Sequence, residues 1–293
     1  RNHISTAVVG TRGGVGASTL ATSLSWYFAS KKHLQTGLLD LDVHFGTGAL
    51  ALDLEPGRGL TDAIDNPGRI DGLFLERAMI RANDNLAVLS AEAPISAPLM
   101  TDGAAFVQLE EEFRQAFEIT VIDLPRNMLI NFPQLLADVN FITVVCEFTL
   151  ASARDTIRIL SWLKTYAPHA QPVLLANKSQ NGLAEISRAD FEASVERKVD
   201  FVIPYDAKAA TNAAKLGQAF VEANKTSKVA AQMRQIVSHI LSAGDEVLEP
   251  AEPAGKKSLL GSLDLKSIMS TSKKSKPSGA SKSKAKGVAK ANA

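Results

Sequence analysis

The chain has 293 residues, of which 45% are hydrophobic, and a formal net charge of +1. This composition excludes a wholly disordered protein, and the length allows one large α/β domain or two small ones with a sizeable core. No run approaches the roughly 18 consecutive apolar residues of a membrane-spanning helix. The single cysteine, Cys146, excludes an intramolecular disulfide and a cysteine-held metal cluster, and it favours a reducing, cytoplasmic location.

The two ends of the chain differ from its middle. Arg1 runs directly into an expected strand, so we expect no signal peptide, and the missing methionine indicates that upstream residues have been lost. From Lys256 onward there are ten lysines and one acid, Asp264, so this end carries +9 and the remainder −8. We expect residues 246–293 to form a basic, low-complexity, disordered tail after a folded domain at residues 1–245. Within it, the leucine-rich stretch 258–269 is either an inert linker or a short docking or membrane-contact segment.

Short apolar runs alternate with helical patterns along the first 245 residues. We expect strands at 6–9, 37–41, 86–89, 119–123, 141–145, 173–177 and 201–203, and helices that include 18–30, 103–117, 152–167 and 226–241. Most of the strands are continuously apolar, which is typical of parallel strands covered on both faces. The alternation predicts an α/β fold: a doubly wound, mainly parallel sheet of about seven strands with helices on both faces. Trp26 and Phe28, in the first helix, are expected to be core residues.

A glycine-rich segment, VVGTRGGVGAST at residues 8–19, follows the first strand and opens the first helix. Glycines allow backbone N–H groups to close around phosphate oxygens, and the helix N-terminus adds positive potential. A hydroxyl after the loop, here that of Ser18, is placed to bind Mg²⁺. Without other motifs, the same segment also fits a plain strand-to-helix turn. The residues expected to surround a phosphate are Gly13, Gly14, Val15, Gly16, Ala17, Ser18 and Thr19.

The loop lacks the lysine of the usual P-loop, because that position is Ala17. An ammonium about 4 Å from a phosphate charge contributes several kcal/mol at an intermediate dielectric constant, so its loss matters. The segment resembles the deviant Walker A motif of the MinD/ParA superfamily, whose additional basic residue starts the glycine run and is Arg12 here. The resemblance implies that Arg12 reaches across a homodimer to the ATP of the partner. Arginine keeps the charge and can hold phosphate by two hydrogen bonds, but we do not expect fast hydrolysis.

Acidic residues stand at the ends of two expected strands, where α/β sheets place their ligands. Asp40 and Asp42 lie in the segment DLDVHFG, and Asp123 ends the segment VID. Each alone is more often a helix cap or a solvated acid, but three strand-end motifs in this order indicate a site. By resemblance to switch I of the superfamily, Asp42 orients the attacking water and Asp40 supports the metal site. By resemblance to Walker B, Asp123 holds Mg²⁺ directly or through water.

Two further segments resemble the base-binding side of the superfamily. Asn177 ends the sixth expected strand in the segment LLANK, and in relatives an asparagine here hydrogen-bonds the adenine edge. Lys178 next to it is either a contact or a solvated strand-end charge. Pro204 and Asp206 lie in VIPYD, which resembles the MinD-type Ile-Pro-x-Asp turn beside the base. An ordinary strand-terminating turn is the alternative.

Two stretches narrow the resemblance, which covers roughly residues 4–245. Residues 40–69 and 123–126 are similar to the CpaE/TadZ pilus-assembly proteins, which also commonly carry alanine in place of the P-loop lysine. Members of that family usually have an N-terminal receiver-like domain, which is absent from this sequence. The resemblance implies an ATP-binding localisation or assembly factor for a Flp/Tad type IV pilus machine. Such a factor is a nucleotide-dependent homodimeric switch with weak or no hydrolysis. The resemblance implies a location in the cytoplasm, at a cell pole or at the periphery of the inner membrane. The implied partners are pilus and secretion machinery proteins.

Other functions stay open at this point. The chain could be a genuine MinD-like ATPase that cycles on a membrane or polar scaffold, or a scaffold that no longer binds nucleotide. The lysine-rich tail leaves open contact with an anionic membrane or non-specific nucleic acid. An iron-protein reductase is excluded by the cysteine count, and the acidic body disfavours a chromosome-partitioning DNA binder. His44 is most simply a loop residue, whereas Arg126 is either a surface charge or a contact to phosphate or a partner.

Overall fold

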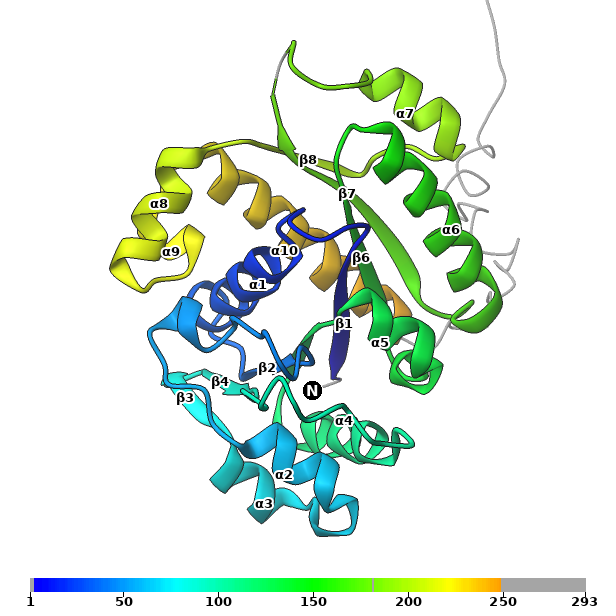
Figure 1. Cartoon of the computed structure of the whole chain (residues 1–293). Coiled ribbons are helices and arrows are strands. Elements are labelled where there is room, and N and C mark those ends of the chain that lie inside the picture. The colour runs from blue at the N-terminus through cyan, green and yellow to red at the C-terminus, as the bar shows by residue number, and fades with distance from the viewer. Residues whose placement is uncertain (1–2, 181, 249–293) are drawn as a thin grey trace, which may run out of the picture. The chain divides into compact units, whose positions relative to one another are not determined.

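An eight-stranded sheet forms the centre of the computed structural model, which describes residues 3–180 and 182–248 (Figure 1). The strand order is β3-β4-β2-β5-β1-β6-β7-β8, and every neighbouring pair is parallel except β3 with β4. The predicted doubly wound, mainly parallel sheet is confirmed. The strands are β1 (Ile4–Gly10), β2 (Thr36–Asp40), β3 (Ile80–Asn83), β4 (Leu86–Leu89), β5 (Ile119–Asp123), β6 (Phe141–Cys146), β7 (Gln171–Ser179) and β8 (Phe201–Pro204).

The sequence pattern does not reveal β3, so the sheet has eight strands rather than about seven. The four residues of β3 alternate between half-buried and exposed, and the strand lies at the edge of the sheet. Its pairing with β4 is also interrupted by a register shift between Arg81 and Asn83. A short, polar edge strand lacks the apolar run by which buried strands are recognised. The seven predicted strands are all present, with ends that differ by at most two residues from those observed.

Two hydrophobic cores lie on opposite faces of the sheet, because successive side chains of each strand point to opposite faces. In β6, for example, Ile142 and Val144 belong to one core, whereas Phe141 and Val145 belong to the other. All four side chains are fully buried. Burial on both faces explains why these strands are continuously apolar in sequence.

Helices cover the two faces as separate layers (Figure 1). Trp26 and Phe28, both in the first helix, are buried, as predicted. Among the helices of the described residues, none is both long and apolar enough to cross a membrane. The first layer consists of α1 (Ala17–Lys31), α8 (Ala207–Leu216), α9 (Phe220–Ala223) and α10 (Lys228–Leu248), and the second of α2 (Gly59–Asp65), α3 (Gly72–Ala78), α4 (Ala104–Ala116), α5 (Arg126–Asn131), α6 (Leu150–Tyr166) and α7 (Arg188–Val195).

The strand order reverses at the central strand, β1. After β1 the chain passes through α1 to β2 on one side of the sheet, and after β5 it crosses to the other side for β6, β7 and β8. In sheets of this kind, ligands bind beyond the carboxyl ends of the strands at such a reversal. The fold therefore places the loop after β1 between the carboxyl ends of β5 and β6.

The C-terminal helix extends past the predicted domain boundary at residue 245, since α10 runs to Leu248. The predicted tail from residue 249 onward, including the leucine-rich stretch 258–269, lies outside the described residues. What we expect of the tail therefore stays a prediction.

Candidate functional site

The loop between β1 and α1 presents backbone groups rather than side chains. Gly14 and Gly16 have left-handed φ angles of 81° and 91°, which glycine tolerates and other residues rarely adopt. Gly16 is also the N-cap of α1, so no side-chain cap occupies the N–H groups of the first helical turn. These N–H groups and the positive end of the helix dipole suit an anion. Residues 11–18 thus have the geometry that a phosphate loop requires.

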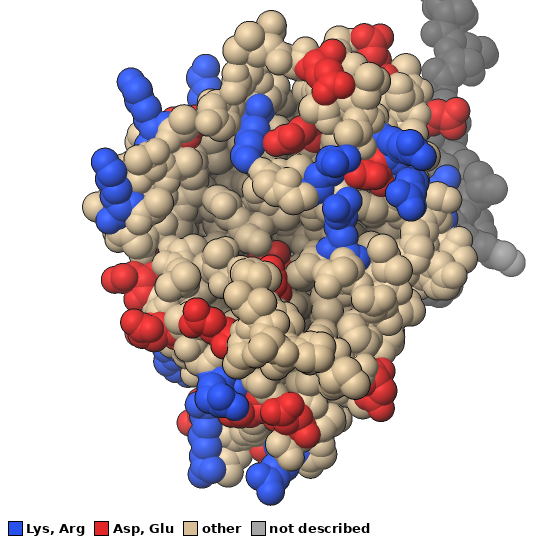
Figure 2. Space-filling view, viewed as in Figure 1, with Lys and Arg blue, Asp and Glu red and all other residues tan. Residues whose placement is uncertain are grey.

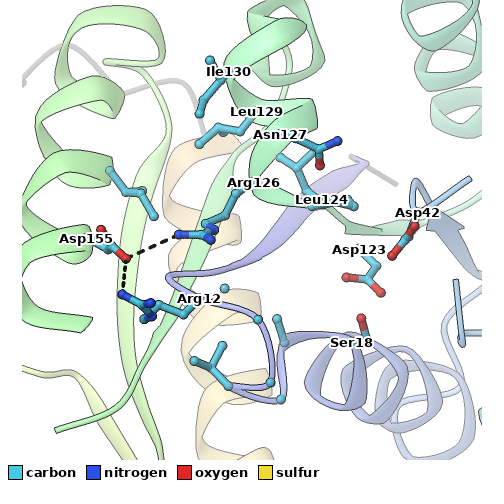
Figure 3. Close-up of a pocket in the computed structure, with 18 of the residues that line it drawn as sticks. Arg12, Ser18, Asp42, Asp123, Leu124, Arg126, Asn127, Leu129, Ile130 and Asp155 are labelled. Atoms are coloured by element: carbon cyan, nitrogen blue, oxygen red, sulfur yellow. Dashed lines mark hydrogen bonds and ion pairs between the residues drawn. The ribbon is translucent and has the colours of Figure 1, made fainter. Parts of the chain in front are cut away.

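The loop opens onto a cavity of ≈ 1480 Å³ at the carboxyl ends of β1 and β5, beside α6 (Figures 2 and 3). A typical small-molecule pocket holds ~300–1,000 Å³, so this cavity has room for more than a small ligand. All the predicted phosphate-loop residues, 13–19, line it, together with Arg12, Asp42 and Asp123. The predicted site residues that do not line it are Asp40, Asn177, Pro204 and Asp206.

Oxygen-bearing side chains meet on one side of the loop (Figure 3). Asp123, at the end of β5, lies beside the hydroxyl of Ser18 in the first turn of α1, and this hydroxyl favours the charged form of the carboxylate. Burial, followed by the nearby charge of Asp40, raises the pKa of Asp123 to about 7. Asp42 faces the same space from the loop after β2. Burial disfavours the charged form of this carboxylate, and a bound hard cation would stabilise it. The carboxylate and the neighbouring hydroxyl are oxygen ligands of the kind that such a cation prefers.

The carboxylate of Asp40 holds the loop after β2 by accepting hydrogen bonds from its backbone. Asp40 is fully buried and paired in register with Asp123 on the neighbouring strand. One carboxylate oxygen accepts the N–H of Asp42 (3.1 Å), and the other accepts the N–H of Gly48 (2.9 Å). Burial raises the pKa of Asp40, and these two hydrogen bonds oppose the rise. A Cβ on Gly46 would lie 2.6 Å from the Asp40 carboxylate, so this loop closes tightly over it. The role of Asp40 at a metal stays a prediction.

Basic side chains gather on the other side of the loop, around a single carboxylate (Figures 2 and 3). Asp155 on α6 has ion-pair contacts of 3.5 Å with Arg12, 3.4 Å with Arg126 and 3.9 Å with Arg158. Arg126 also donates to the carbonyl of Thr11, so it is tied to the loop rather than being a free surface charge. The sequence gives no signal for Asp155, because it lies 143 residues from Arg12 and in the middle of an ordinary helix.

The predicted base-binding side contacts the protein itself. The amide of Asn177 donates to the carbonyl of Val15 (2.8 Å). Asp206 caps α8 by accepting the N–H of Ala209 (2.9 Å), and Pro204 ends β8. The contacts of Pro204 and Asp206 fit the alternative of an ordinary strand-terminating turn, here followed by a helix cap. Nucleotide contact by the three predicted residues stays a prediction.

Apolar side chains line the outer part of the cavity. Phe45 and Ile130 are 67% and 66% exposed, and Ile157 and Trp162 continue the apolar lining along α6. Exposed apolar side chains that gather beside a cavity mark a surface that another molecule covers. Nothing in the spacing of these residues along the sequence connects them. His44, by contrast, donates to the carbonyl of Ala97 (2.6 Å) and is a loop residue, as expected.

Among the described residues, no group of three or more His, Cys, Asp and Glu side chains is arranged to hold a metal ion. Mg²⁺ is commonly held by one or two carboxylates together with substrate phosphates and waters rather than by a protein-only cage. The pair of Ser18 and Asp123 beside an anion-binding loop has the chemistry for that kind of site.

Comparison with protein-family models gives no match, and comparison with curated proteins gives none either. Solved structures do match. The ParA family ATPase of Chlorobium tepidum is 16% identical with a TM-score of 0.73, and the alignment covers 82% of this chain and 98% of that one. A chain of the MinC:MinD cell division complex of Aquifex aeolicus is 17% identical with a TM-score of 0.68, over 82% and 96%. MinD of Pyrococcus horikoshii, complexed with Mg-ADP, is 16% identical with a TM-score of 0.67, over 85% and 100%. The chain therefore has the α/β fold of MinD and ParA ATPases.

Proposed function

We propose that the chain is an ATP-binding switch that forms a homodimer bridged by nucleotide. One observation carries the proposal: a glycine loop with a helix N-terminus opens onto a cavity that also holds the Ser18–Asp123 pair. An anion site beside oxygen ligands for Mg²⁺ is what a Mg²⁺-nucleotide complex requires. The binding of Mg-ADP by a protein of the same fold supports the choice of ligand.

The residues divide the work according to their position. Gly13, Gly14, Val15, Gly16, Ala17, Ser18 and Thr19 surround the phosphates with backbone N–H groups. Ser18 and Asp123 hold Mg²⁺, which neutralises phosphate charge when it is bound, and Asp40 supports them from below. Asp42, which lines the cavity, orients the attacking water. Asn177, Pro204 and Asp206 border the base.

Turnover is expected to be slow or absent. Ala17 leaves the loop without the ammonium that stabilises the charge developing on transferred phosphate. Arg12, the residue proposed to act across the dimer, is held by Asp155 in the single chain. Its side chain is nevertheless 53% exposed, so a second copy can approach it. The apolar side chains of Phe45 and Ile130 provide the adjoining contact surface.

We infer further that this switch serves as a CpaE/TadZ-type localisation or assembly factor for a Flp/Tad pilus machine. Segments 40–69 and 123–126 support that assignment, because they are the parts of the sequence most similar to this family. The proposed setting is the cytoplasm, at a cell pole or at the inner membrane, with pilus and secretion proteins as partners. The basic tail is a candidate for contact with anionic lipid or nucleic acid. A MinD-like cycling ATPase is the second candidate, favoured by the charge that Arg12 retains beside the loop.

Calorimetric titration of Mg-ATP into the full chain tests the nucleotide proposal. Saturable binding is expected for the wild type. A loss of at least about tenfold in affinity is expected for Asp123→Ala, since a metal-coordinating charge is removed. Asp62→Ala removes an exposed aspartate on α2 that does not line the cavity, and it should bind like the wild type. No heat at millimolar ATP, confirmed by equilibrium dialysis, would leave the alternative of a scaffold that has lost its ligand.

A further inference from the structure

Two successive residues at the end of β7 donate hydrogen bonds to the phosphate loop. The amide of Asn177 donates to the carbonyl of Val15, and the ammonium of Lys178 donates to the carbonyl of Gly14. A Cβ built on Gly16 would lie 2.5 Å from the Asn177 nitrogen and 3.8 Å from Cε of Lys178. Two neighbouring peptides of the loop are thus held by two neighbouring side chains that are more than 160 residues away in sequence.

An irregularity in the sheet aims these side chains at the loop. Ala176 pairs with Val202 and Ser179 with Pro204, so β7 carries one extra residue at this point relative to β8. Lys178 itself has a φ angle of 51°, a conformation that costs a non-glycine residue roughly 1–2 kcal/mol. Bulges next to binding sites commonly redirect a side chain in this way. Strained backbone positions cluster at functional sites, so the strain at Lys178, which directs this lysine towards the loop, indicates a function for the side chain.

Of the basic side chains that line the cavity, Lys178 is the one for which the described residues provide no ion-pair partner. Among the described residues that line the cavity, the basic ones are Arg12, Arg126, Arg158 and Lys178. The three arginines share the carboxylate of Asp155. Within the described range, no carboxylate forms an ion pair with Lys178. Its charge is therefore available to the loop that lacks a lysine at position 17.

We propose that Lys178 is a positioning residue that brings a positive charge from β7 to the phosphate loop, in which position 17 is alanine, and that Lys178 and Asn177 together set the shape of the loop. In a trans peptide the N–H points away from the carbonyl. Holding the carbonyls of Gly14 and Val15 therefore directs the N–H groups of Val15 and Gly16 to the opposite side, where phosphate is proposed to lie. Donation to a carbonyl also polarises its peptide and strengthens the N–H as a donor. This inference rests on the proposed binding of a nucleoside triphosphate.

The test compares Mg-ATP affinities of full-length variants by calorimetry. Lys178→Met keeps most of the side-chain volume and removes the charge, and Lys32→Met is the matched control, an exposed lysine at the far end of α1. We expect Lys178→Met to bind at least ~10-fold more weakly and Lys32→Met to bind like the wild type. We also expect Ala17→Lys, placed in the Lys178→Met chain, to restore affinity to within about threefold of the wild type, because it returns a cation to the loop.

Hydrogen exchange of the nucleotide-free chains separates shape from charge. We expect faster exchange of the amides of residues 13–17 in Lys178→Met than in Lys32→Met, with unchanged exchange in β5 and β6. Wild-type affinity in Lys178→Met, or a double variant that stays weak, overturns the inference while leaving the nucleotide proposal intact. Absence of Mg-ATP binding by the wild type overturns the nucleotide proposal, and the inference with it.

Discussion

Opposite charges face each other across the phosphate loop, and single residues decide what each side can do. Asp123 and Asp42 lie on one side, where a cation is needed, and Arg12 and Arg126 lie on the other. Asp155 carries the one negative charge that these two arginines share with Arg158, and it is only 15% exposed. The charge balance of the cavity therefore depends on a residue whose ion-pair partners, among the described residues, are all arginines.

Replacing Asp155 with asparagine should strengthen the binding of anions at this rim. The change keeps the size of the side chain and removes the charge shared by Arg12 and Arg126. Because both arginines are about half exposed, we expect a gain of only about twofold to fivefold in Mg-ATP affinity. Calorimetry at low salt measures it, and Asp62→Asn, which removes an exposed partner of Arg58 elsewhere, is the control. Equal or weaker binding by Asp155→Asn would show that the carboxylate does not restrain these arginines.

Glu110 on α4 should make the stability of the fold dependent on pH. It is buried, one of its carboxylate oxygens has no hydrogen-bond partner among the described residues, and burial raises its pKa to about 9 from an ordinary 4.5. Between these two values the folded state binds more protons than the unfolded state, so the free energy of unfolding falls as pH rises. Urea unfolding at pH 5 and pH 8.5 should show a fall on the order of a few kcal/mol in the wild type.

The neutral variant Glu110→Gln should remove most of this fall. Glu111→Gln, on the exposed face of the same helix, should keep the wild-type dependence because its carboxylate lies in water. If the two variants lose stability equally with pH, Glu110 is already ionised in the folded protein and does not cause the fall.

At the scale of elements, β1, the loop and α1 act together with β7. Gly16 must reach a φ angle of 91° and must also leave room for Asn177. Replacement with alanine should therefore deform the loop and abolish measurable Mg-ATP binding. We also expect a destabilisation of about 1 kcal/mol or more, from the left-handed backbone and the contact with Asn177.

Gly68→Ala is the matched control, because a Cβ there meets nothing within 4 Å and φ is not left-handed. It should bind Mg-ATP like the wild type and unfold at the same temperature. Calorimetry and thermal unfolding of both variants measure the effect. Normal binding by Gly16→Ala would mean that the loop does not need the conformation described.

The elements that could be predicted from sequence are those whose signal is local. Strands such as β5 are continuous apolar runs, and the phosphate loop and Asp123 are each contained in a few consecutive residues. β3 carries no such signal, because it is short, polar and stabilised by its neighbour β4. The ion pairs of Asp155 with the arginines and the hydrogen bond from Lys178 to Gly14 were not predicted either. They depend on which distant segments the fold brings together, and residue spacing does not contain that information.

For the whole molecule, a group of exposed apolar side chains beside the cavity provides a candidate contact surface for a second copy. Phe45 and Ile130 are each about two-thirds exposed and border the same space as Arg12. Placing a charge there, as in Ile130→Glu, should weaken a nucleotide-dependent dimer by at least about tenfold while leaving Mg-ATP affinity of the single chain within threefold. Leu183→Glu, which alters an exposed apolar residue that does not line the cavity, should dimerise normally. Equal dimerisation by the two variants would move the contact surface elsewhere.

The most direct test of the switch is the molecular mass of the full chain in solution, measured by sedimentation velocity without nucleotide, with Mg-ADP and with Mg-ATP. The subunit mass of 31.2 kDa makes monomer and dimer easy to distinguish. The proposed switch predicts a monomer without nucleotide and with Mg-ADP, and a dimer with saturating Mg-ATP that is lost in Asp123→Ala. A mass that is the same under all three conditions would contradict it.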